Sequence, residues 1–273
     1  MTTRRNITAA RLAELKSQLT DLDLAVLRSV SDLRFMTGAQ LARLHFSEDH
    51  GPRARAARRA LLRLCDLECL SRLPRIVGGV RAGSKGFVYV LGIAGQKLAF
   101  DFDWQPKRRG RRSQSPGLLF LRHCLDIAEL HVLLVEADRD RRLELLELVA
   151  EPLCHRTYVG LGNQRVLKPD SFVRVGVGEW EFSYFIEVDR GTEGSRAIAA
   201  KLREYLTYEA SGAEQQEHGV FPKVLWSVPD EARVAVIGAE IEQLPIAGRE
   251  LFGVVQFREA VAVLTAPDGA VRS

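Results

Sequence analysis

Residues 52–67 have the pattern of an amphipathic helix with an arginine-rich leading end. Ala57, Leu61 and Leu64 recur at helical spacing, and Pro52 suits the first turn. Most arginines of the segment lie off this apolar stripe. The candidate DNA-contacting arginines are Arg53, Arg55, Arg58, Arg59 and Arg63. The pattern is typical of a recognition helix that enters the major groove of DNA, and the alternative is a surface helix that is basic by chance.

Two shorter helices are predicted before this segment. The first covers residues 21–31, with Thr20 or Asp21 as its N-cap. The second begins after Thr37, because Gln40 three residues later completes a capping-box pattern. Thr37 and Gln40 are also included among the candidate DNA-binding residues.

A β-hairpin is predicted after the arginine-rich segment. Leu70–Val77 and Phe87–Leu91 are strand-like, and the glycine-rich stretch between them contains Arg81 and Lys85. A basic tip of this kind would lie along phosphates or in the minor groove. Three helices followed by a basic hairpin predict a winged helix-turn-helix over residues 1–100.

Charge divides the chain into a basic and an acidic part. Residues 1–112 contain 22 Lys and Arg against 10 Asp and Glu, a net +12, and the remaining 17 against 25 give −8, which together make the +4 of the whole chain. A basic domain is the usual electrostatic footprint of nucleic-acid binding, although a merely solvated surface is also basic at times. Residues 101–117 are predicted to be a linker, and its basic run suggests a further phosphate-contacting arm. The candidate arginines of this arm are Arg108, Arg109, Arg111 and Arg112.

Length and composition favour two globular domains inside a cell. The 273 residues exceed one ordinary domain core, and a hydrophobic share of 46% is normal for a globular protein. There is no apolar run long enough for a membrane span and no signal-peptide pattern, so we expect no membrane association. The four cysteines form no Cys-x-x-Cys pair, and buried thiols are therefore favoured over a zinc site.

The acidic part, residues 118–273, is predicted to be an α/β domain. It begins with a long apolar helix, Leu118–Ala137, whose His123, Glu129 and His131 are either site residues or, more often in such helices, packing residues. Strands and helices then alternate, while Leu143–Ala150 is ambiguous. The predicted strands are Val166–Val175, Trp180–Asp189, Val224–Val228 and Phe252–Phe257, and the predicted helices are Arg196–Glu209 and Arg233–Glu242.

Three carboxylates lie at strand ends in this part of the chain. Asp170 opens one predicted strand, and Glu187 and Asp189 end the next, where alternation would direct both to one face. Such a group suits Mg²⁺ or Mn²⁺, with Asp170 and Glu187 as ligands, and the metal would activate water. The alternative is that these carboxylates are solvated or pair with Arg190, Lys168 or Lys201.

Several strings of the sequence resemble the replication-relaxation family over roughly residues 20–210. They are Thr37–Phe46, the arginine-rich helix ending at Leu64, Tyr89–Gly92 with Gly95, Lys168–Asp170, Phe185–Glu193 and Lys201–Leu202. The family occurs on bacterial plasmids, phages and integrated mobile elements. The resemblance implies a role in the replication and relaxation of plasmid DNA, in the cytoplasm and near the nucleoid or the plasmid.

The second half also resembles the restriction-endonuclease-like fold. Its signature is Pro-Asp followed by Asp or Glu, any residue and Lys, and here Pro169-Asp170 and Glu187 match. Asp189 stands where the lysine is expected, which removes a positive charge from the position that normally activates water. The resemblance implies Asp170, Glu187, Asp189 and Lys201 as candidate catalytic residues, with Lys201 or Lys168 supplying the missing charge.

Two hypotheses from different classes follow. In the first, the chain is a double-stranded DNA-binding protein of a mobile element, with a nuclease-like scaffold for a homodimer or for replication or mobilisation proteins; a transcriptional repressor is a variant of it. In the second, it is a metal-dependent DNA endonuclease or nickase directed by the winged helix. The cluster of Asp170, Glu187 and Asp189 separates them, because an enzyme needs it to bind metal.

Overall fold

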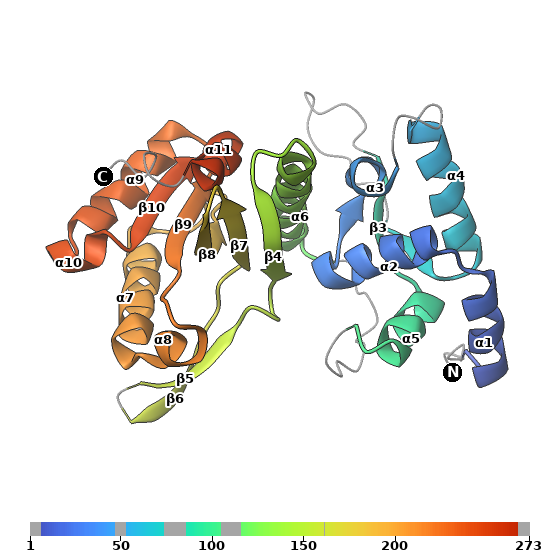
Figure 1. Cartoon of the computed structure of the whole chain (residues 1–273), viewed down its shortest axis with the longest axis horizontal. Helices are drawn as coiled ribbons and strands as arrows, with labels where there is room; N and C mark the ends of the chain where they lie inside the picture. Colours follow the sequence, from blue (N-terminus) through green and yellow to red (C-terminus); the bar gives the residue numbers. More distant parts are fainter. Residues whose placement is uncertain (1–6, 47–52, 74–85, 105–115, 161, 267–273) are drawn as a thin grey trace. The chain divides into compact units, whose positions relative to one another are not determined.

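A computed structural model describes residues 7–46, 53–73, 86–104, 116–160 and 162–266 (Figure 1). The chain divides into two compact units, Met1–Val132 and Leu133–Ser273. The division falls within one long helix, α6 (Leu118–Arg139), at whose first residue the sequence placed the start of the second domain. Both α-helices and β-strands are present, and the larger sheet contains parallel and antiparallel pairs.

Unit 1 contains helices packed around a small antiparallel sheet. Its helices are α1 (Ala9–Gln18), α2 (Asp21–Leu33), α3 (Gly38–His45), α4 (Arg53–Asp66) and α5 (Ile93–Asp101), besides the first part of α6. Its strands are β1 (Met36–Thr37), β2 (Leu70–Arg72) and β3 (Val88–Leu91), in the order β1-β3-β2. The three predicted helices and the two hairpin strands are confirmed within the described residues, whereas α1 and α5 were not predicted.

Local capping explains where two of these helices begin. Thr20 and Asp23 form a capping box at the start of α2, and Thr37 and Gln40 form another at the start of α3. In each case the threonine hydroxyl accepts a hydrogen bond from the backbone N–H three residues later, and the side chain of that later residue accepts one from the threonine N–H. The capping box predicted from Thr37 and Gln40 is therefore confirmed.

Two glycines let α5 approach the start of β2 closely. A Cβ atom at Gly92 would lie 2.2 Å from the carbonyl oxygen of Glu68, and one at Gly95 would lie 2.1 Å from that of Cys69. No side chain fits at these separations, so glycine is required at both positions. The backbone contacts include a hydrogen bond from Gly92 N to Cys69 O of 2.9 Å.

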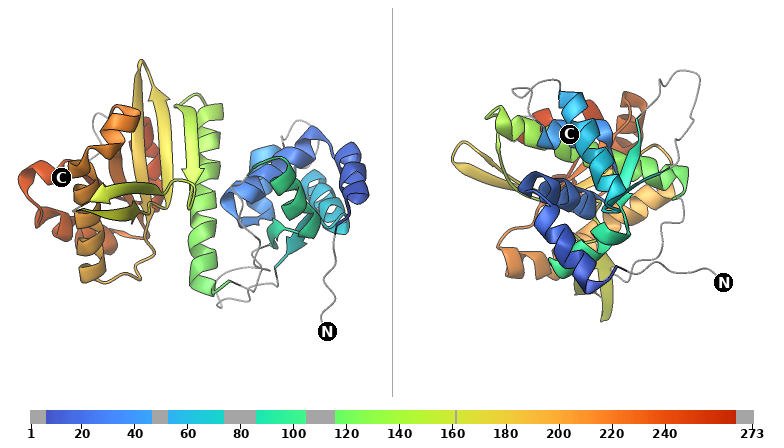
Figure 2. Two further views of the ribbon diagram at one scale, coloured as in Figure 1. Left: turned by 90° about the horizontal axis from the view of Figure 1, so that it is seen from below. Right: turned by 90° about the vertical axis from the view of Figure 1, so that its right-hand side faces the viewer.

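Unit 2 is built on a five-stranded mixed sheet in the order β10-β9-β8-β7-β4. Strands β4, β7 and β8 are antiparallel neighbours, and β8, β9 and β10 run parallel to one another. The strands are β4 (Glu144–Ala150), β7 (Ser171–Val177), β8 (Trp180–Val188), β9 (Lys223–Val228) and β10 (Phe252–Gln256). A separate hairpin, β5 (Arg156–Gly160) and β6 (Asn163–Leu167), lies apart from this sheet (Figure 2).

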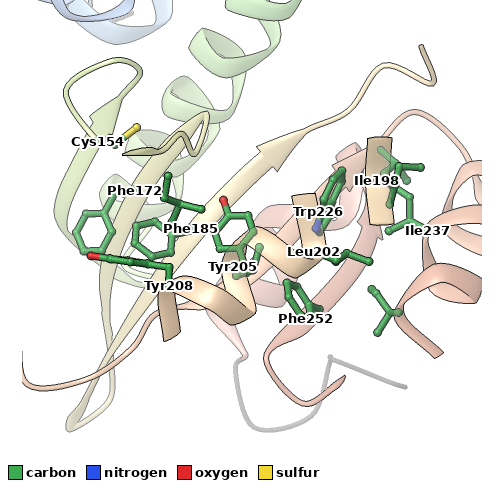
Figure 3. Close-up of a cluster of buried hydrophobic side chains, with 14 of the residues drawn as sticks. Cys154, Phe172, Phe185, Ile198, Leu202, Tyr205, Tyr208, Trp226, Ile237 and Phe252 are labelled. Carbon is green, nitrogen blue, oxygen red and sulfur yellow. The ribbon is translucent and has the colours of Figure 1, made fainter. Parts of the chain in front are cut away.

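Helices complete unit 2. They are α7 (Ser195–Ser211), α8 (Ala213–His218), α9 (Glu231–Glu242), α10 (Ile246–Arg249) and α11 (Ala260–Thr265), besides the last part of α6. Helices α7 and α9 pack against each other and against one face of the sheet. The side chains between these helices and the sheet form a core rich in aromatic residues, which includes Phe185, Tyr205, Trp226 and Phe252 (Figure 3).

One predicted strand of unit 2 was wrong in its extent. Val166–Val175 was predicted as a single strand, but β6 ends at Leu167 and β7 begins at Ser171. Pro169 lies in the break, and proline has no N–H to donate to a sheet. The ambiguous segment Leu143–Ala150 forms β4.

No helix in the described part of the chain combines the length and the apolar composition that crossing a membrane requires.

Candidate functional site

Helix α4 separates an apolar face from a cationic one. Ala57 and Leu61 are each 2% exposed and Leu64 is fully buried, and the helix packs through this stripe against α3 and β2. Four arginines of the same helix are exposed, and they are Arg55, Arg58, Arg59 and Arg63. Among the described residues, none forms an ion pair with Arg55, Arg58 or Arg59, whereas Arg63 pairs with Asp23. The helix also includes Arg53, whose side chain lies outside the described atoms.

Arg63 differs from the other three exposed arginines in having an ion-pair partner. Its guanidinium donates to both carboxylate oxygens of Asp23, which is 1% exposed. Burial alone would raise the pKa of Asp23, but hydrogen bonds from Arg63 and Thr20 outweigh it and lower that pKa below its usual value. Arg63 therefore ties α4 to the start of α2.

Thr37 and Gln40 are engaged inside unit 1. Besides its cap contact to Thr37, Gln40 donates from Nε2 to Leu125 O and to Glu129 Oε2, each at 3.0 Å. Gln40 is only 5% exposed. Arg43 also donates to Glu129, at 2.5 Å, and these contacts hold α3 against the first part of α6. The structure thus gives Thr37, Gln40 and Glu129 positioning roles in the packing of α3.

The other basic residues predicted to contact DNA are not among the residues that the structure describes. The hairpin residues Arg81 and Lys85 lie outside the described residues, as do Arg108, Arg109, Arg111 and Arg112 of the predicted arm. They remain predictions from the sequence.

The carboxylate cluster of unit 2 is centred on Glu187. Glu187 lies on β8, is 1% exposed, and accepts a hydrogen bond from Lys201 Nζ at 2.9 Å and another from the Tyr205 hydroxyl. Both partners come from α7, which crosses this face of the sheet. Sequence reasoning anticipated Lys201 as a partner of Glu187 but missed Tyr205.

Asp170 lies beside Glu187 at the start of β7. Its Oδ2 accepts a hydrogen bond of 2.7 Å from Val188 N, which fixes the carboxylate across the β7–β8 pair. Burial and the charge of Asp170 raise the pKa of Glu187 to about 7, against the opposing effect of Lys201. Burial disfavours the charged form of Lys201, but Glu187 and Asp170 outweigh it and raise the pKa of that ammonium group. Asp170, Glu187 and Lys201 are therefore electrostatically linked.

Asp189 belongs to a separate ion pair. It follows the last residue of β8 and accepts hydrogen bonds from the Arg233 guanidinium on α9 and from Gly191 N. The bond from Arg233 Nη2 to Asp189 Oδ1 is 3.1 Å long, and that from Gly191 N is 3.0 Å long. Arg233 also donates to Glu193 O at 2.8 Å. Arg233 thus holds both ends of the loop between β8 and α7. Sequence reasoning missed this role, because nothing in the local pattern of α9 links it to Asp189.

Protein groups already engage the carboxylates that the sequence suggested for an Mg²⁺ or Mn²⁺ site. Both oxygens of Glu187 accept protein hydrogen bonds, and both oxygens of Asp189 accept them from Arg233. Hard divalent cations need carboxylate oxygens directed at a common point. Among the described residues, no group of three or more His, Cys, Asp or Glu is arranged to hold a metal ion.

The buried cysteines and His131 take part in packing. The four cysteines are free thiols, and Cys154 donates to Pro169 O at 3.1 Å. Burial, with His45 nearby, lowers the pKa of His131 to about 4, so this side chain is neutral at physiological pH. Cys154 supports the turn that carries Asp170, and neither residue gathers metal ligands.

Comparison with known proteins gives one match. Neither the search of curated proteins nor that of solved structures returned a match. The family model described as replication-relaxation matches residues 27–224, a range that starts in α2 and ends in β9. It includes α4 with its exposed arginines as well as Asp170, Glu187 and Lys201. Since this match covers well over half of the sequence, the chain belongs to the replication-relaxation family.

Proposed function

We propose that the chain is a double-stranded DNA-binding protein that acts in the replication or relaxation of a plasmid or other mobile element. In this proposal unit 1 is a winged helix, α4 is its recognition helix, and the hairpin of β2 and β3 is its wing. Unit 2 is a nuclease-like domain that acts as a scaffold. The family membership supports the biological setting, and unit 1 supports the activity.

The observation that carries the proposal is the row of exposed arginines on α4. The order α2-β1-α3-α4-β2-β3, with β3 between β1 and β2, is the order of helices and strands in winged helices. In that arrangement the outer face of α4 meets the major groove. Arg55, Arg58 and Arg59 lie on the exposed side of the helix, where guanidinium groups can reach phosphates or guanine edges.

Binding of a labelled duplex, measured by fluorescence anisotropy over a series of salt concentrations, tests this proposal. Each phosphate neutralised contributes about −0.9 to the slope of log K against log salt, so three arginines on α4 predict a slope of about −3 or steeper. A single strand of the same length is the control and should bind more weakly. Absence of duplex binding at low salt would contradict the proposal.

A metal-dependent nuclease is the second candidate function. It is favoured by one observation, the proximity of Asp170, Glu187 and Lys201 at neighbouring ends of β7 and β8. The engagement of Glu187 and Asp189 by protein cations weighs against it, and we therefore propose DNA binding as the function.

A further inference from the structure

The ammonium group of Lys201 lies among the carboxylates of unit 2. Lys201 Nζ is 2.9 Å from Glu187 Oε2 and 3.6 Å from Glu193 Oε1. The charge of Asp170 also acts on it. On another side the ammonium lies 5.2 Å from the centre of the Trp226 ring, a cation–π distance. The Lys201 ammonium thus interacts electrostatically with three carboxylates and with one aromatic ring.

This ammonium contacts one of the two carboxylates predicted from the sequence as metal ligands. Glu187 and Asp170 were the predicted ligands, and Glu187 now gives one oxygen to Lys201 and the other to Tyr205. A divalent ion bound to the same carboxylate would lie within a few ångströms of the Lys201 ammonium, and the two like charges would repel each other. Lys201 comes from α7, whose residues Ile198, Leu202 and Tyr205 are fully buried, so the helix is fixed against the sheet.

A second ion pair engages the other carboxylate at the end of β8, that of Asp189. Arg233 engages both oxygens of Asp189, and its own side chain is only 11% exposed. Each acid at this end of β8 therefore has a cation supplied by a helix on the same face of the sheet, Lys201 from α7 and Arg233 from α9. Glu187 and Asp189 thus each have a counter-ion supplied by the chain itself.

We propose that Lys201 is a built-in counter-ion that takes the place of a divalent metal, so that unit 2 binds neither Mg²⁺ nor Mn²⁺ in its folded state. The consequence is a nuclease-like domain without metal-dependent cleavage. This inference goes beyond DNA binding and does not depend on it, because it concerns residues of unit 2 alone.

Titration of the full chain with Mn²⁺, followed by the electron paramagnetic resonance signal of free Mn²⁺, tests the inference without DNA. The expected result for the wild-type chain is no loss of free Mn²⁺ signal and no shift of Tm with Mn²⁺ or Mg²⁺. Lys201→Ala is expected to bind about one Mn²⁺ per chain, because it opens Glu187 and Asp170 to an ion. Adding Glu187→Gln to that variant should abolish the new site.

Two results would overturn the inference. One is stoichiometric Mn²⁺ binding by the wild-type chain that Glu187→Gln removes. The other is a folded Lys201→Ala chain that binds no Mn²⁺, since Lys201 would then not be what occupies the site. If Lys201→Ala does not fold, the wild-type titration decides the question by itself. DNA binding by anisotropy is a separate measurement, so failure of one proposal can be told from failure of the other.

Discussion

Replacing Arg58 and Arg59 together by alanine is expected to weaken duplex binding by about 10- to 100-fold at moderate salt. Both side chains are exposed on α4, and alanine keeps the helix because neither belongs to its buried stripe. The slope of log K against log salt should become less steep by about 2, as two phosphate contacts are lost. Fluorescence anisotropy over the salt series measures both effects.

The matched control removes two charges from the other unit. Arg196 and Arg258 are exposed residues of unit 2, and their double alanine variant changes the net charge by the same amount. It should bind nearly as well as the wild type. Equal losses of affinity in both double variants would indicate that binding depends on the net charge of the chain and not on α4. Unchanged affinity on replacing Arg58 and Arg59 would reject α4 as the DNA-contacting helix.

Lys201→Met is expected to destabilise the chain by about 3–5 kcal/mol, the usual cost of removing one partner from a buried ion pair. Glu187 is 1% exposed and would lose its counter-ion, while methionine keeps the length of the side chain. Urea denaturation measures the free energy of unfolding at a pH above 7, because without Lys201 the pKa of Glu187 rises above its wild-type value of about 7. Part of the loss should be recovered at lower pH, because protonation removes the buried charge of Glu187.

The double variant Lys201→Met with Glu187→Gln is the control for this effect. It removes both charges and keeps both side-chain shapes, so most of the stability should return. A double variant as unstable as Lys201→Met would show that packing of the lysine stem, and not its charge, matters. An unchanged free energy of unfolding in Lys201→Met would contradict the role of Lys201 as counter-ion.

Much of unit 1 could be predicted from local sequence. The spacing of Ala57, Leu61 and Leu64 correctly identified the buried stripe of α4, and Thr37 with Gln40 correctly identified the start of α3. These features depend on contacts within one or two helical turns, which the sequence displays directly. The same local pattern did not show that Gln40 also reaches α6, 85 residues further along the chain.

The candidate site of unit 2 was predictable only in part. Asp170, Glu187 and Lys201 could be selected from the sequence, and the structure brings them together. The ion pair of Asp189 with Arg233 joins residues 44 positions apart, and it depends on how α9 packs beside α7. Alternation along a strand placed Asp189 with Glu187, but Asp189 lies beyond the end of β8, where alternation no longer governs direction.

Incubation of the purified chain with supercoiled plasmid, in Mg²⁺, Mn²⁺ or EDTA and beside a Glu187→Gln control, tests most directly the claim that this is a DNA-binding protein on a non-cleaving nuclease-like domain. Agarose electrophoresis resolves bound, nicked and linear plasmid. We expect retarded plasmid in every buffer, with no nicked or linear product from either protein. Metal-dependent nicking by the wild type that disappears in Glu187→Gln would contradict the account and make the chain a nuclease.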